Sequence, residues 1–105
     1  MDLRELVESK QPSAPVAFRS AAIDAEVFIH RLTGQETKQF QVWRVGKSAG
    51  EIQAKIVQLS LCDAYDALLY KPGEEQKVSE LRNLFLSEIV LESCRVNGLL
   101  DSDVR

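Results

Sequence analysis

Residues 27–40 have the sequence VFIHRLTGQETKQF, and within them the apolar spacing changes from that of a strand to that of a helix. Val27 and Ile29 share one side of the chain at the two-residue period of a strand. Thr33 and Glu36 then match a capping box, in which each side chain accepts a hydrogen bond from the backbone N–H of the other residue. A strand that passes directly into a capped helix is therefore expected here.

The preceding segment, VAFRSA (16–21), repeats the strand pattern, with Val16 and Phe18 on one side. Asp24 lies between the two apolar runs and suits a turn. We therefore predict an antiparallel hairpin in which residues 16–21 pair with residues 26–32. An isolated hairpin is only marginally stable in water, so this one is expected to lie against helices.

Helical spacing dominates the rest of the chain, because apolar residues recur three and four positions apart. The helix that follows the capping box is expected to bury Phe40 and Trp43. The next helix is predicted over residues 51–63, with so many apolar positions that it belongs at the centre of the core. Between them, the sequence GKSAG (46–50) is interpreted as a helix terminator, with Gly46 in the left-handed conformation.

Residues 74–98 form the last helical region. Leu84 and Phe85 are expected on the buried side of its first half. The region is either one kinked helix or two helices, the second capped by Ser87. Gly98 predicts a left-handed stop at its end.

Together these elements predict an α+β fold in which a small antiparallel hairpin packs against about four helices. Residues 68–70, with the sequence LLY, are a candidate third short strand. Residues 1–15 are interpreted as an N-terminal helical segment and linker, because two prolines interrupt the helical pattern. Residues 16–100 are interpreted as a single α+β domain and residues 101–105 as a flexible tail.

The composition excludes several classes of protein. The chain has 105 residues, and 13 basic against 16 acidic residues give a formal net charge of −3. A nucleic-acid partner is not expected, because phosphate binding favours a basic surface. No apolar run approaches the roughly 20 residues of a membrane span, so no membrane partner is expected either. The low cysteine content favours a reducing cytoplasm.

Residues suited to catalysis or metal binding are few. His30 is the only histidine, and Cys62 and Cys94 do not form a C-x-x-C pair. A zinc site needs about four ligands in tight groups, so neither a metal nor another cofactor is predicted. Asp63 and Asp66 are interpreted as turn residues. The protein is therefore expected not to be an enzyme.

Binding through the surface remains, and the candidate partner-binding residues are Phe18, Phe28, His30 and Trp43. Trp43 is the only tryptophan, a residue type enriched at binding hot spots. The favoured interpretation nevertheless places Trp43 in the core beside Phe40, because helical spacing accounts for it. A charge at Phe40 is expected to unfold the protein, whereas changes at His30 are expected to leave its stability intact.

Four short stretches occur in a characteristic order: RLTGQE (31–36) with Phe40 four residues on, LSLCD (59–63), LLY (68–70) and VNGL (96–99). In this order, over roughly residues 16–100, the chain resembles the small tail assembly chaperones of long-tailed bacteriophages. None of these stretches is a catalytic signature.

The resemblance implies a non-enzymatic chaperone of a phage or prophage. Such a protein binds the tape measure protein and assists polymerisation of the tail tube protein around it. The resemblance further implies action in the host bacterial cytoplasm, self-association into a homo-oligomer, and absence from the mature virion. The alternative is a structural tail completion or head–tail connector protein that is retained in the virion.

Overall fold

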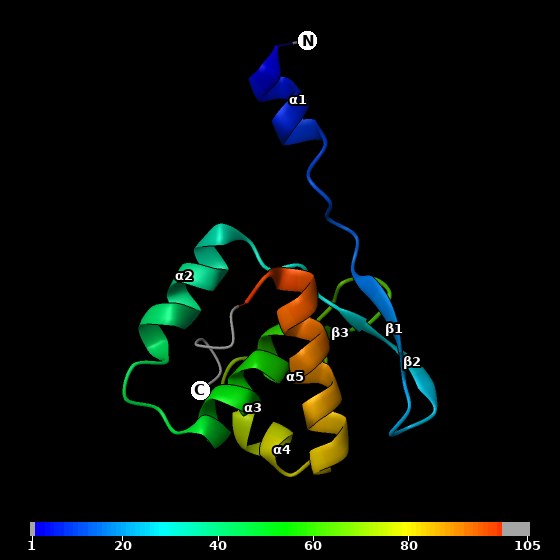
Figure 1. Ribbon diagram of the computed structural model, residues 1–105, viewed down its shortest axis with the longest axis vertical. Coiled ribbons are helices and arrows are strands. Elements are labelled where there is room, and N and C mark those ends of the chain that lie inside the picture. Colours follow the sequence, from blue (N-terminus) through cyan, green and yellow to red (C-terminus); the bar gives the residue numbers. More distant parts are fainter. Residues whose placement is uncertain (1, 100–105) are drawn as a thin grey trace.

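The computed structural model describes residues 2–99 as five helices and a three-stranded antiparallel sheet in the order β1-β2-β3 (Figure 1). The predicted α+β class is confirmed. In chain order the elements are α1 (Leu3–Ser9), β1 (Val16–Ser20), β2 (Ala25–Ile29), α2 (Gly34–Trp43), α3 (Ala49–Ser60), β3 (Leu61–Cys62), α4 (Glu75–Ser79) and α5 (Asn83–Asn97). The tail predicted over residues 101–105 lies outside the described residues.

The predicted hairpin is formed by β1 and β2. Val16 pairs with Ile29 and Phe18 with Val27, so the expected apolar side faces the core. Asp24 occupies the turn with a φ of 51°. Pairing ends at Ile29, short of the predicted boundary, because the backbone N–H of the next residue donates to the carbonyl of Ser60, at 2.7 Å, and the chain turns toward α2.

The third strand was predicted at the wrong place. It consists of Leu61 and Cys62, which pair with Ile29 and Phe28 of β2, whereas Leu68 forms only an isolated bridge to Cys62. The helix predicted to continue to residue 63 accordingly ends at residue 60. An apolar run of this kind fits a helix or a strand equally well by periodicity, and pairing with β2 selects the strand.

The starts of α2 and α3 have the same local chemistry. Thr33 and Glu36 form the predicted capping box of α2. A second capping box, formed by Ser48 and Glu51, starts α3 within the GKSAG segment that was interpreted only as a terminator. Gly46, at a φ of 79°, adopts the predicted left-handed conformation between the two helices.

The region 74–98 contains two helices, but they are separated at residues 80–82 and not at Ser87. Ser87 lies inside α5, whose first residues follow an extended N-cap at Arg82. The break changes the helical phase, so Leu84 is 75% exposed while Phe85 is buried. The end of α5 is as predicted: Gly98 has a φ of 67°, and the following N–H donates to the carbonyl of Cys94.

The core lies where α3 and α5 pack against each other and α5 packs against the sheet. Its fully buried members include Phe40, Ile29, Ile56, Val57, Leu61, Val78 and Ile89. Glu88 of α5 fastens the tip of the hairpin: it accepts from the Ser20 hydroxyl at 2.5 Å and from the backbone N–H groups of Ala21 and Ala22 at 2.9 and 3.1 Å.

Helix α1 projects away from this body (Figure 1). None of its residues is buried, and Leu3, Leu6 and Val7 expose an apolar side. Among the described residues, no helix is both long and apolar enough to cross a membrane.

Candidate functional site

The predicted partner-binding residues do not form one patch. Phe18 lies on the core-facing side of the hairpin, half-buried against the core. Phe28 alternates with the buried Val27 and Ile29, so its half-buried side chain belongs to the opposite face of the sheet. His30 follows β2 directly, and Trp43 is the last residue of α2.

Trp43 fits both roles considered for it, that of a core residue and that of a partner-binding residue. Its ring stacks against Phe40, with centroids 6.3 Å apart and planes inclined by 25°, so part of it extends the core. The ammonium groups of Lys47 and Lys55 lie 5.2 and 5.5 Å from the ring centroid. In such cation–π contacts the cation lies over the face of the ring, so both lysines border an indole that is only partly buried.

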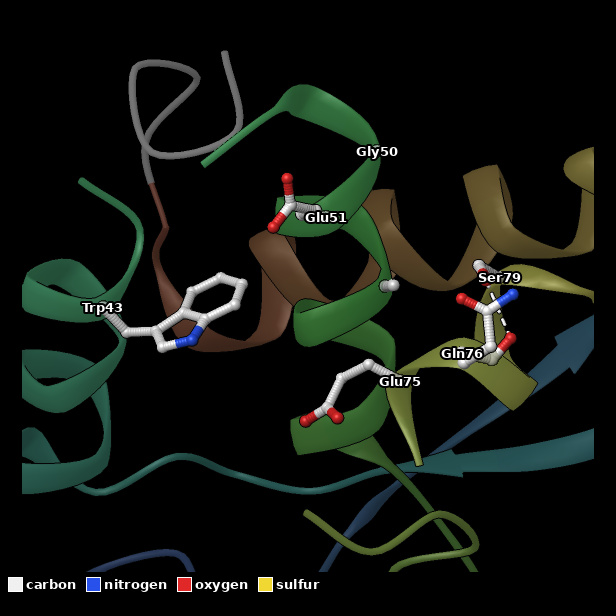
Figure 2. A pocket seen from close by; sticks show the side chains of 7 residues that line it. Trp43, Gly50, Glu51, Glu75, Gln76 and Ser79 are labelled. Carbon is white, nitrogen blue, oxygen red and sulfur yellow. Dashed lines mark hydrogen bonds between the residues drawn. The ribbon is translucent and has the colours of Figure 1, made fainter. Parts of the chain in front are cut away.

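Of the hollows that Trp43 lines, two also include residues of α3, and we call the lining of these two the Trp43 surface. One, of about 390 Å³, is lined by Trp43, Gly50, Glu51, Ala54, Glu75, Gln76 and Ser79. The other, of about 270 Å³, is lined by Glu36, Gln39, Phe40, Trp43, Lys55, Leu59 and Pro72. Figure 2 shows the indole directed from α2 toward α3, and the Glu75 side chain extending from α4 toward the same space.

An ion pair joins the two hollows. The Lys55 ammonium donates to Glu75 at 3.0 Å, and the two side chains are 17% and 28% exposed. Burial alone would raise the pKa of Glu75, but hydrogen bonds from the backbone and from Lys55 outweigh it and lower that pKa. The Trp43 surface therefore combines apolar walls with fixed charges.

A second cluster surrounds His30. Its Nδ1 lies 2.8 Å from Asp66 Oδ1, and its Nε2 lies 3.2 and 3.3 Å from the two oxygens of Glu36. The ring is 19% exposed. Nothing in the sequence places Asp66 beside His30, because the two residues are 36 positions apart. The capping box was a usable signal for Glu36, since it folds that side chain back toward the residues that precede α2.

The two carboxylates shift the titration of the histidine. Burial alone would lower the pKa of His30, but hydrogen bonds to Asp66 and Glu36 and their negative charges raise it above its ordinary value. Burial likewise opposes the net shift at Glu36, where hydrogen bonds from Thr33 and His30 lower the pKa. Both ring nitrogens face carboxylates of the same chain, so the cluster links the end of β2 to the first turn of α2 and to the turn over residues 63–67.

Cys62 lies beside this cluster without the properties of a nucleophile. Burial, together with the charges of Asp66 and Asp63 and a hydrogen bond to Asp66, raises its pKa to about 12. The thiolate is the reactive form of cysteine, so this sulfur is unreactive near neutral pH. Within residues 2–99, no group of three or more His, Cys, Asp or Glu side chains is placed to hold a metal ion.

An apolar hollow of about 680 Å³ lies at the far end of the hairpin, between its tip and the start of α5. It is lined by Ala22, Ile23, Leu81, Arg82, Asn83, Leu84 and Phe85. Sequence reasoning missed it because Leu84 was expected in the core.

The chain matches no protein-family model, no curated protein and no solved structure.

Proposed function

We propose that this protein is a tail assembly chaperone of a phage or prophage, which binds the tape measure protein and assists polymerisation of the tail tube. It acts in the host bacterial cytoplasm without catalysing a reaction and leaves before the virion is complete. The ordered stretches RLTGQE, LSLCD, LLY and VNGL support the family. The Trp43 surface is the observation that supports binding of another polypeptide.

Three properties of the Trp43 surface favour a polypeptide partner. Its hollows are open to solvent. Their linings combine aliphatic and aromatic side chains with amides and carboxylates. Tryptophan at the meeting point of two hollows is the residue type that most often dominates binding energy. An interface of mixed polarity also suits a partner that is released later, because affinity in such complexes is set largely by the rate of dissociation.

The direct test is co-expression with the tape measure protein encoded in the same phage or prophage. We expect the wild-type chain to keep the tape measure protein soluble and to co-purify with it. Trp43→Ala removes a hot-spot side chain, for which a loss of about tenfold or more in affinity is expected. Leu91→Ala is the control, because Leu91 is 71% exposed on α5, away from the hollows.

Trp43 also packs on Phe40, so a loss of stability could imitate a loss of binding. Gln76→Arg separates the two, because Gln76 is exposed at the rim of the larger hollow and its replacement fills that hollow without opening the core. Equal binding by all three variants would refute the assignment of this surface. Stoichiometric recovery of the protein from purified particles would refute the chaperone and favour the tail completion or connector protein.

A further inference from the structure

His30 contacts side chains from two other segments: it follows β2 and meets both the first turn of α2 and the turn over residues 63–67. Asp66 holds one ring nitrogen from the turn, and Glu36 holds the other from α2. Glu36 Oε1 also accepts from the backbone N–H of Thr33 at 2.8 Å, so the same carboxylate caps the helix. The histidine and the start of α2 are thus mechanically coupled.

The chemistry of imidazole makes this coupling depend on one proton. A protonated ring has two N–H donors and satisfies both carboxylates, whereas a neutral ring has one donor and one lone pair. We propose that His30 is a proton-dependent link: protonated, it ties the first turn of α2 to the turn over residues 63–67, and on losing its proton it releases Glu36, which loosens that first turn and changes the hollow that Glu36 and Trp43 both line. This inference is independent of the proposed function.

The distances indicate which contact is lost. The Asp66 contact is short, at 2.8 Å, whereas Glu36 is shared between two longer contacts at 3.2 and 3.3 Å. The neutral ring therefore keeps its proton on Nδ1 for Asp66, and its Nε2 lone pair then faces the Glu36 carboxylate. Two acceptors cannot bond each other, so this contact becomes repulsive.

The other groups packed around the ring do not replace the lost proton. Cys62 of β3 presents a thiol, and Asp63 of the turn uses Oδ1 to accept from the backbone N–H groups of residues 65 and 67. On the α5 side, the neutral amide of Asn97 donates to the backbone carbonyl of His30. The neighbouring Arg31 directs its Nε to the carbonyl of Ala14 at 3.0 Å.

Two residues of the chain can serve as spectroscopic probes. His30 is the only histidine, and Trp43, at the end of α2, is the only tryptophan. The experiment follows the imidazole ring by NMR, the Trp43 emission and the amide exchange of α2 over a range of pH. We expect the ring to titrate with a midpoint above 6.5, and the emission to change with the same midpoint. Relative to the intrinsic exchange rate at each pH, the protection of amides in the first turn of α2 should fall about tenfold, as for the loss of one hydrogen bond to a charged group.

Matched variants complete the test. His30→Gln and Glu36→Gln should abolish the change in Trp43 emission, whereas Glu51→Gln, in the equivalent capping box of α3 where no histidine is bound, should leave its midpoint unchanged. Measurements on the wild-type protein are enough to overturn the proposal. A ring midpoint at or below 6.5 would do so, and so would a titration that leaves Trp43 and α2 unaffected. A change in emission that persists in His30→Gln would overturn it as well.

Discussion

At the scale of single residues, two neighbouring carboxylates change the contribution to stability that is expected of His30. From the sequence it was a partly exposed histidine whose replacement should be harmless. In the structure it makes contacts of 2.8 and 3.2 Å with two carboxylates. We therefore expect its removal to destabilise the fold, contrary to the sequence-based expectation, because two partly buried carboxylates would lose their donor.

The first prediction concerns the dependence of stability on pH. The pKa of His30 is raised on folding, so its contribution is complete below pH 6.5 and is lost as the pH rises through the folded value. The pKa of Glu36 is lowered, so its contribution is present above pH 4.5 and is lost as the pH falls through its folded value. Urea unfolding should show greatest stability between these limits. His30→Gln should flatten the alkaline side, and an unchanged alkaline slope would contradict this.

The second prediction compares two residues of α2. Phe40 is 2% exposed and Val42 is 69% exposed. Phe40→Ala should cost about 3–5 kcal/mol of unfolding free energy, as truncation of a buried aromatic does. Val42→Ala should stay within about 0.5 kcal/mol, as exposed replacements do. Chemical denaturation measures both, and similar losses would show that the helix is phased differently.

At the scale of elements, two signals that are each confined to one turn predicted the structure correctly, whereas the equally local capping box of Ser48 and Glu51 was missed. The Thr33 capping box and the Gly98 stop were both visible in the sequence and are both present. The two-residue strand β3 could not be predicted, because its strand character comes from pairing with β2, far away in the chain. The same limit applies to the candidate site: Trp43 could be singled out, but not the hollows formed by α2, α3 and α4 around it.

A third prediction separates a true cap from an apparent one. Ser48 caps α3, and Ser48→Ala should destabilise the protein by about 1 kcal/mol. Ser87 was expected to cap a helix but lies inside α5, where alanine is the better helix former. Ser87→Ala should therefore leave the melting temperature unchanged or slightly higher. Equal losses from the two replacements would indicate a helix start at Ser87 after all.

At the scale of the whole molecule, the body formed by the sheet and α2–α5 contrasts with the projecting α1 (Figure 1). A seven-residue helix without buried contacts has little stability of its own in water. The body is instead held by long-range contacts, among them the hydrogen bonds of Glu88 to the hairpin tip.

The fourth prediction follows from this contrast. Deletion of residues 2–12 removes α1 and spares Ala14, whose carbonyl accepts from Arg31. The unfolding free energy should change by less than about 0.5 kcal/mol, because no side chain of α1 is buried. Thermal melts of the two forms provide the measurement. A large loss would mean that α1 packs against the body in solution.

The hydrogen bond between Glu88 and Ser20 joins residues 68 positions apart. It can therefore form, and hold the tip of the hairpin, only after α5 has left the ribosome. Strands without their covering helix are marginal, and unsupported strand edges invite wrong partners during synthesis. Translation should thus yield a fully protease-resistant core abruptly, once α5 has emerged, and a ribosome stalled before residue 83 should display a nascent chain that is still readily digested.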